Sequence, residues 1–277
     1  MPTPLGNLGD ITLRALEVLR SCDLIAAEDT RVARRLLAAL QLPGKPIVSY
    51  REANAASMTP RILERARGGD VAVVCDAGTP GISDPGRELV AAAREASVPV
   101  LALPGPVAFV TAAVLSGFDL PGLTFEGFLP RTAAGRRAAF ETALAASGPT
   151  VWYESPHRIV AALEVLASVD PEGDVFLARE LTKLHEQQIL GKPRDVIARL
   201  AEPVRGEIVL VLAPHPRAAT APDDADVDRT IDALLAEGLR PTEIAKRLAA
   251  QTGNDRAAAY GRVIARQRAR IPGKPRR

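Results

Sequence analysis

The chain has few of the residues that build metal centres, disulfide frameworks or aromatic stacking surfaces. Its 277 residues include two cysteines, three histidines and one tryptophan, and aromatic residues make up 4% of the total. Cys22 and Cys75 lie in or beside apolar runs, which is typical of buried, reduced thiols. The histidines have no metal-ligand spacing, so the pattern predicts no metal site.

Long apolar runs are also missing. No run reaches the roughly 18 residues that a membrane-spanning helix needs, and no signal-peptide pattern precedes the first motif. The composition, with 47% hydrophobic and 25% charged residues, is that of a globular protein. We therefore expect a cytoplasmic protein that makes no use of a membrane.

Positive charge is not in large excess, but it is clustered. The formal net charge is only +2, which argues against a uniformly basic nucleic-acid coat protein. The basic side chains gather in three groups: Arg31, Arg34 and Arg35; Arg131, Arg136 and Arg137; and the C-terminal stretch 262–277. Such clusters favour phosphate binding more than net charge does, and solvated helix faces are the competing explanation.

Three turns rich in glycine and proline are the most informative feature that is present. They span residues 2–10, 76–86 and 103–106, and each adjoins a helical pattern. Glycine allows bare backbone to approach a ligand, so three such turns in an α/β pattern predict a nucleotide-like cofactor across the strand ends. The central turn lacks the Gly-Lys-Ser/Thr of a Walker loop, and its prolines remove backbone donors. We therefore expect carbonyl and apolar contacts to an adenosine-type ligand.

Alternating strand-like and helical patterns predict an α/β protein with two α/β domains and a small helical domain. The expected divisions are an N-terminal domain over 1–121, a second domain over 122–213, a linker over 214–226, a helical domain over 227–270 and a disordered basic tail over 271–277. The helical domain is similar to a helix-turn-helix, although a plain three-helix cap explains the pattern equally well.

Local signals in the N-terminal domain give more detailed expectations. Asp10 is expected to cap the first helix, and the Asp84-Pro85 pair is expected to start another. Residues 98–103 read as a strand whose proline makes its first turns irregular.

Charged residues follow several of the predicted strands. Residues 28–31 come directly after an apolar run, and residues 153–158 and 178–183 occupy equivalent positions in the second domain. Because open α/β sheets bind ligands at the carboxyl ends of their strands, these sets predict a site that faces the glycine- and proline-rich turns. Helix capping by Asp29 or Thr30 is the alternative explanation for the first set.

Taken together, these segments resemble the tetrapyrrole-methylase superfamily of S-adenosylmethionine-dependent methyltransferases, and within it a group of bacterial methyltransferases of small-subunit ribosomal RNA. The matching strings are PTPLGNLGDITLRALEVL, LIAAEDTR, DAGTPGISDPG, LPGP, FEGFLPR, YESPHR, ARELTK and GEIVLVL. The resemblance implies a Rossmann-like N-terminal domain, a second α/β domain, S-adenosylmethionine in the cleft between them, and a homodimer. The implied reaction is methylation of a cytidine ribose 2′-hydroxyl in 16S ribosomal RNA near the decoding centre.

The resemblance also implies a set of residues that contact the cofactor. They are Pro4, Gly6, Ala77, Gly78, Thr79, Pro80, Ile82, Val107, Ala108, Glu154 and Ala178. For removal of the hydroxyl proton the candidates are Glu28, Asp29 and Glu126, while Arg31 and Arg179 are candidates for holding RNA phosphates and Lys183 for assisting. The sequence does not rank these six.

Two positions depart from the family pattern. The family has a central strand before the Pro-Thr-Pro turn, whereas this sequence begins at Met1, so we expect either a start further upstream or a sheet with an unfilled slot. In addition, Leu184-His185-Glu186 stands where an aromatic residue is expected before the glutamate.

Two other functions remain open at the level of the sequence. A carbon methyltransferase of a porphyrin precursor on the same fold would need a cationic cleft for many carboxylates and no nucleic-acid module. A non-catalytic nucleic-acid-binding protein would use the helical domain alone and would bind no cofactor.

Overall fold

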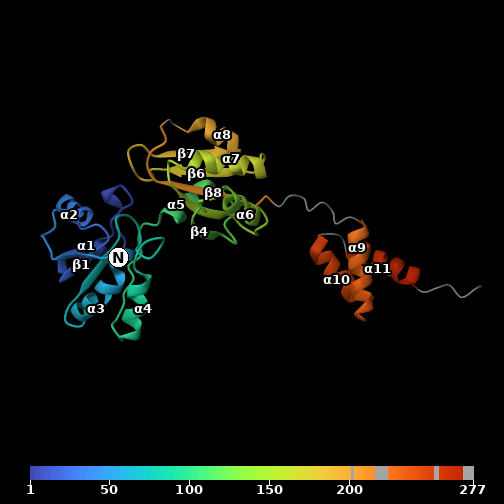
Figure 1. The fold of residues 1–277 in the computed structure, drawn as a ribbon, viewed down its shortest axis with the longest axis horizontal. Helices are drawn as coiled ribbons and strands as arrows, with labels where there is room; N and C mark the ends of the chain where they lie inside the picture. The colour runs from blue at the N-terminus through green and yellow to red at the C-terminus, as the bar shows by residue number, and fades with distance from the viewer. Residues whose placement is uncertain (201–202, 216–223, 253–255, 271–277) are drawn as a thin grey trace, which may run out of the picture. The chain divides into compact units, whose positions relative to one another are not determined.

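The computed structural model describes residues 1–200, 203–215, 224–252 and 256–270 (Figure 1). The chain divides into two compact units, Met1–His215 and Pro216–Arg277. The first unit contains two separate β-sheets in its described residues, and the second is helical. The division of the first unit near residue 121 stays a prediction.

A parallel sheet with the order β2-β1-β3 forms the centre of the N-terminal half, as far as the structure describes it. Its strands are β1 (Leu24–Ala27), β2 (Ile47–Ser49) and β3 (Val71–Val74). The elements around it are η1 (Leu8–Asp10), α1 (Leu13–Ser21), α2 (Thr30–Ala39), η2 (Glu52–Asn54), α3 (Ala55–Ala66) and α4 (Arg87–Glu95). β1 is buried along its whole length, as expected of a central parallel strand.

Alternate residues of β1 enter two different cores. Ile25 packs with Leu19 of α1 and Leu37 of α2. Ala26 packs on the other face with Ile62 of α3 and Leu89 of α4. Because strand side chains alternate between faces, the sheet is covered by helices on both sides and its polar loops are left at the strand ends.

Two capping expectations were wrong. The N-cap of α1 is Thr12, whose hydroxyl oxygen accepts a hydrogen bond from the Ala15 amide at 3.1 Å, and Asp10 belongs to the preceding 3-10 turn. α4 begins at Arg87 with Gly86 as its N-cap, at a φ of 148° that favours glycine. Asp84 therefore lies outside the helix and does not cap it.

Residues 98–103 do not form the expected strand. A strand requires a hydrogen-bonded neighbour, and among the described residues β3 pairs only with β1. Leu101 is consequently 88% exposed. β3 is an edge strand of the described sheet, and the Met1 amino group donates a hydrogen bond to its Val73 carbonyl oxygen at 2.7 Å.

The second sheet of the first unit is mixed and has the order β4-β5-β8-β6-β7 in the described residues. Its strands are β4 (Thr124–Phe128), β5 (Thr150–Glu154), β6 (Val175–Arg179), β7 (Gln187–Gly191) and β8 (Ile208–Leu212). β4 runs parallel to β5, whereas β8 pairs antiparallel with both β5 and β6. β7 pairs antiparallel with β6, so the two consecutive strands form a hairpin.

Helices also cover both faces of this sheet. They are α5 (Ala108–Ser116), α6 (Ala133–Leu144), α7 (Ile159–Val169) and α8 (Pro193–Arg199). Trp152 packs with Phe140 of α6 and Leu163 of α7 on one face. Val151 packs with Ala112 and Ala113 of α5 on the other. The segment that links the two sheets thus supplies a covering helix of the second one.

The second unit contains the helices α9 (Asp224–Ala236), α10 (Pro241–Thr252) and α11 (Arg256–Arg270) in its described part. Its core consists of Ile231, Ile244, Leu248 and Val263. The described residues of this region are helical, and the helical domain over 227–270 stays a prediction. Most of the expected linker and the whole basic tail lie outside the described residues. No helix among the described residues is long and apolar enough to cross a membrane.

Candidate functional site

The first unit contains a cavity of about 330 Å³ beyond the carboxyl ends of β3 and β5. Its walls come from both halves of the unit, and its size is within the range of small-molecule sites. The lining residues are Leu5, Ala77, Gly78, Thr79, Ile82, Ser83, Asp84, Val107, Ala108, Phe128, Tyr153, Glu154, Ser155, Pro156, Gly206, Glu207, Ile208 and Val209.

Hydrogen bonds bring the three glycine- and proline-rich turns together at this cavity. The backbones of Thr3 and Gly78 exchange two hydrogen bonds of 2.8 and 3.1 Å, which joins the first turn to the second. The Thr79 hydroxyl donates to the Pro106 carbonyl oxygen at 3.0 Å, which joins the second turn to the third. Gly78 has a φ of 79°, and an added Cβ would lie 3.2 Å from Leu5, so glycine is needed at this crossing.

The cavity contains most of the residues expected to contact a cofactor, but not all of them. Those that line it are Ala77, Gly78, Thr79, Ile82, Val107, Ala108 and Glu154. Pro4 and Ala178 are instead buried, Gly6 lies against the aliphatic part of Lys183, and Pro80 is half-buried outside the lining. Contact between any of these residues and a cofactor remains a prediction.

The lining is acidic. It contains three carboxylates and no lysine, arginine or histidine. Glu207 pairs with Lys183 at 3.1 Å, and Glu154 pairs with Arg158 at 2.9 Å. Asp84 forms no ion pair with a cation of the described residues, and so it is the carboxylate that keeps its charge uncompensated.

Glu154 has a structural explanation for its burial. Its side chain is 0% exposed, and its Oε1 accepts a hydrogen bond from the Ser155 amide at 2.7 Å. Its Oε2 makes a close ion pair with Arg158 without hydrogen-bond geometry. Arg158 in turn donates to the carbonyl oxygens of Leu129 and Pro130 at 2.6 and 3.1 Å. The pair therefore joins the end of β5 to the loop after β4.

Asp84 is half-buried in the wall of the cavity, at the end of a distorted turn. Ser83, just before it, has a φ of 61°, which side-chain-bearing residues seldom adopt. Burial raises the pKa of Asp84 to about 6, with the charge of Glu28 adding to the effect. Sequence reasoning missed this residue because an aspartate before a proline so often caps a helix.

Two aromatic side chains contribute to the apolar part of the wall, and the sequence analysis did not anticipate them. Phe128 and Tyr153 both line the cavity, with ring centroids 5.7 Å apart in an edge-to-face arrangement. Phe125 stacks on Phe109 at 4.2 Å behind them. Phe128 is 57% exposed, so it offers a ring face at the mouth of the cavity.

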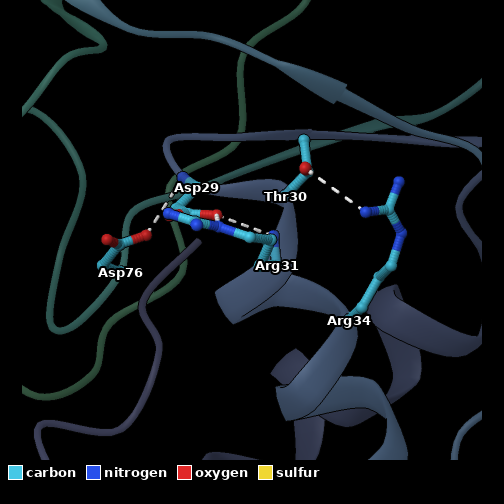
Figure 2. A network of polar contacts seen from close by, with 5 residues as sticks. All are labelled: Asp29, Thr30, Arg31, Arg34 and Asp76. Carbon is cyan, nitrogen blue, oxygen red and sulfur yellow. Dashed lines mark hydrogen bonds and ion pairs between the residues drawn. The ribbon is translucent and has the colours of Figure 1, made fainter.

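The charged set after β1 is outside the lining of the cavity. Figure 2 shows the polar contacts that this set makes. Asp29 is the N-cap of α2, since its carboxylate accepts a hydrogen bond from the Arg31 amide at 2.7 Å. The Arg31 guanidinium also binds this carboxylate, and these hydrogen bonds hold the pKa of Asp29 well below its usual range. Asp76 accepts from the Asp29 amide at 3.1 Å, and Arg34 donates to Thr30 at 3.4 Å. Capping thus explains Asp29 fully, and a catalytic role for it stays a prediction.

The other catalytic candidates are also outside the lining. The Glu28 carboxylate accepts a hydrogen bond from the Asp76 amide at 3.4 Å, and burial raises its pKa. Glu126 is exposed on β4, and Arg179 donates to the Arg205 carbonyl oxygen at 3.2 Å. The Lys183 ammonium group pairs with Glu180 at 2.8 Å and also with Glu207. Of these three residues, Glu207 is the one that lines the cavity.

Two further observations define where the site lies. A larger, open hollow of about 520 Å³ is lined by surface residues of α3 and α4, such as Leu63 and Ala92, and it lies away from the strand ends. Among the described residues, no group of three or more His, Cys, Asp or Glu side chains is arranged to hold a metal ion. The cavity at the strand ends is therefore the candidate site.

The fold and this cavity define a class of α/β protein that holds a small ligand between two sheets, and the comparisons agree. Residues 2–197 match the family described as Tetrapyrrole (Corrin/Porphyrin) Methylases. A uroporphyrin-III C-methyltransferase from Thermus thermophilus, solved in complex with S-adenosyl homocysteine, has a TM-score of 0.52 at 19% identity, covering 76% of this chain and 94% of that one. This likeness concerns the fold alone.

Closer relatives identify the group within that class. A protein of Micromonospora olivasterospora named ribosomal RNA small subunit methyltransferase I is 46% identical over 86% of this chain and 75% of its own length. A protein of the same name from Synechocystis sp. is 38% identical over 93% of this chain and 94% of its own length. The chain belongs to the tetrapyrrole methylase family, in its group of ribosomal RNA small subunit methyltransferases I.

Proposed function

We propose that this protein is an S-adenosylmethionine-dependent methyltransferase that methylates the 2′-hydroxyl of a cytidine in 16S ribosomal RNA near the decoding centre. The identity to relatives of that name, over most of both chains, carries the proposal. The methylated position on the ribose and the nucleotide rest on the motif resemblance. We expect the enzyme to act in the cytoplasm as a homodimer.

The chemistry of the cavity fits the proposed cofactor. A wall with three carboxylates and no basic side chain suits a cationic ligand without phosphate groups, and it disfavours a dinucleotide. Ile82, Val107 and Leu5 offer apolar contacts, and the bare backbone at Gly78 allows close approach. S-adenosylmethionine supplies an electrophilic methyl group at a positively charged sulfur atom.

The residues of the chain would act mainly by positioning. The converging turns hold the cavity open at the strand ends, and Phe128 at its mouth offers a surface on which a base can stack. An acceptor hydroxyl must approach in line at about 3 Å, so rigid placement supplies much of the rate. Arg31 is 82% exposed and outside the lining of the cavity, which suits a contact to an RNA phosphate.

The test is transfer of labelled methyl groups from S-adenosylmethionine to small ribosomal subunits from a strain that lacks this gene. Label on a 16S ribose is the expected result, and no label on a substrate known to be unmethylated would exclude the function. Uroporphyrinogen should be tested as a second acceptor. Carbon methylation of that acceptor would favour the porphyrin-precursor alternative.

A further inference from the structure

We propose that Asp84 is the catalytic residue that accepts the proton of the attacking ribose hydroxyl. This inference rests on the proposed function, and it assigns a role to a residue that the motif resemblance did not single out.

Elimination among the carboxylates of the cavity is the first argument. Glu154 is bound by Arg158 and by the Ser155 amide, and Glu207 is bound by Lys183. Asp84 has no cationic partner among the described residues, although it lines the same cavity. A carboxylate held in an ion pair is a weak base, because its partner stabilises the deprotonated form. Asp84 is the lining carboxylate that escapes this weakening.

The backbone around Asp84 is the second argument. Ser83 at a φ of 61° and Gly86 at 148° bracket Asp84, so the segment leaves the regular path of a strand-to-helix turn and directs residue 84 into the cavity wall. Left-handed conformations at side-chain-bearing residues cost free energy and gather at functional sites. A helix cap would not need this geometry, and α4 in fact begins beyond it.

The surroundings of Asp84 make it a stronger base than an ordinary aspartate. The groups that face it are the Glu28 carboxylate, the Cys75 thiol, the Asp76 carboxylate, the Glu207 carboxylate and the Tyr153 ring. Burial and then the charge of Glu28 raise its pKa to about 6, against the opposing effect of the hydrogen bond with the Cys75 thiol. Such a group is mostly deprotonated at neutral pH, yet it binds a proton more readily than an ordinary aspartate, as general-base catalysis requires.

The step balances without a further reactant. The hydroxyl oxygen forms a bond to the methyl carbon, while the bond from that carbon to sulfur breaks and leaves its electron pair on sulfur. The O–H bond breaks at the same time, and its proton moves to the Asp84 carboxylate. Asp84 then returns the proton to water once the product has left.

The experiment compares wild type with Asp84→Asn and with the control Glu164→Gln, which removes an exposed carboxylate of α7. Two quantities are measured: the single-turnover rate of methyl transfer to small subunits as a function of pH, and the affinity for S-adenosylhomocysteine by calorimetry. For Asp84→Asn we expect a rate about 10²–10⁴-fold lower, with unchanged affinity. The wild-type rate should rise with pH up to about 6 and then level off, and this rise should be absent from the variant.

Each outcome decides the matter. A rate loss with unchanged affinity and a lost pH dependence supports the assignment. A rate that stays within about threefold of wild type, or an affinity loss of tenfold or more, overturns it, the latter because Asp84 would then be a cofactor ligand. If wild type transfers no methyl group to small subunits at all, the proposed function itself fails, and that result is separate from any effect of the substitution.

Discussion

Asp84 illustrates how a single side chain is placed for chemistry at a cost to the fold. It is half-buried, faces other carboxylates and lacks a cation among the described residues, so its charged form is disfavoured in the native state. Its pKa in the fold is about 6, above the ordinary value of 3.8. The free energy of unfolding is therefore lowered by this group above pH 6 and unaffected by it below pH 3.8, with the change spread between the two values.

Asp84→Asn should accordingly stabilise the protein near neutral pH. A shift of this size in a fully buried group would correspond to about 3 kcal/mol, and solvent screening of a half-exposed group reduces it to about 1 kcal/mol. We expect a melting temperature about 2–4 °C higher near neutral pH, and no gain near pH 4. Thermal unfolding followed by circular dichroism over this range measures it. A gain of equal size at every pH would contradict the explanation.

Lys183 connects three parts of the site. Its ammonium group binds Glu180 and Glu207, and its aliphatic chain covers Gly6 of the first turn. Burial lowers the pKa of Lys183, but the hydrogen bonds that its ammonium group donates to both glutamates outweigh this effect and raise the pKa. The same ammonium group lowers the pKa of Glu180 against the opposing effect of burial.

Lys183→Met should therefore weaken the fold by about 1 kcal/mol, because two carboxylates lose a shared partner while the packing on Gly6 is kept. Lys192→Met is the matched control, since Lys192 pairs with Asp174 alone on an exposed surface. Urea unfolding of both variants makes the comparison. Equal effects would show that the contacts to Glu180 and Glu207 add no more to stability than the single pair of Lys192 with Asp174.

The sequence indicated where the cavity lies, but not which charged side chains line it. The glycine- and proline-rich turns signalled the cavity because backbone conformation is a local property, and seven of the expected cofactor residues line it. None of the six expected catalytic residues lines the cavity. Which side chains face a cavity depends on how distant segments of the chain pack together, and a local pattern does not show this. Asp84 was missed for this reason, since only the position of Gly86 and Arg87 shows that the helix starts later.

At the scale of elements, the junction between β5 and α7 depends on one ion pair. Glu154 ends β5 with a fully buried carboxylate, and Arg158, one helical turn later, reaches both this carboxylate and the loop that follows β4. A buried charge tolerates the loss of its partner poorly, because no water can replace it.

We expect Arg158→Met to lower the free energy of unfolding by about 3 kcal/mol. Glu154→Gln combined with Arg158→Met should recover part of this loss, because the amide that replaces the carboxylate carries no charge. Denaturant unfolding of the single and double variants tests both statements. A double variant no more stable than Arg158→Met would mean that the lost contacts of Arg158 to Leu129 and Pro130 dominate.

Elements with a strong local signal were predicted correctly, and those that depend on partners were not. The apolar run before residue 28 forms the buried strand β1, and Asp29 caps the helix α2 that follows it. Residues 98–103 have a strand-like composition yet pair with no described strand, because a strand is stabilised by its neighbours. Thr12 rather than Asp10 caps α1, because Asp10 belongs to a 3-10 turn that precedes the helix. The hydrophobic periodicity of the sequence does not predict this turn.

At the scale of the whole molecule, the positive charge of the C-terminal unit is smaller than its composition suggests. Arg262 pairs with Asp228 at 3.0 Å, and Arg266 pairs with Asp232 at 2.7 Å, so these arginines tie α11 to α9. Lys246 and Arg247 are exposed on α10, where Arg247 has only a long contact of 3.8 Å to Glu243. These two side chains are the better candidates for contacts to RNA.

Replacing Lys246 and Arg247 by glutamine should weaken binding to small subunits and reduce its dependence on salt. Each lost phosphate contact lowers the slope of log affinity against log salt by about 0.7–0.9. Filter binding at several salt concentrations measures this slope. The same substitution at Arg65, an exposed residue of α3, is the control. An unchanged slope would exclude α10 from the RNA contact.

The absence of basic residues from the lining of the cavity has a consequence for the energetics of turnover. Before transfer, the site would hold a positive sulfur atom and a negative Asp84; after it, both charges have been neutralised together. A site that is partly shielded from solvent favours a step that cancels opposite charges, since less solvation is lost as they disappear. No arginine or lysine lines the cavity, and the two that pair with its lining, Arg158 and Lys183, are bound by Glu154 and Glu207 rather than by Asp84. The site is thus suited to a step that leaves it with fewer separated charges.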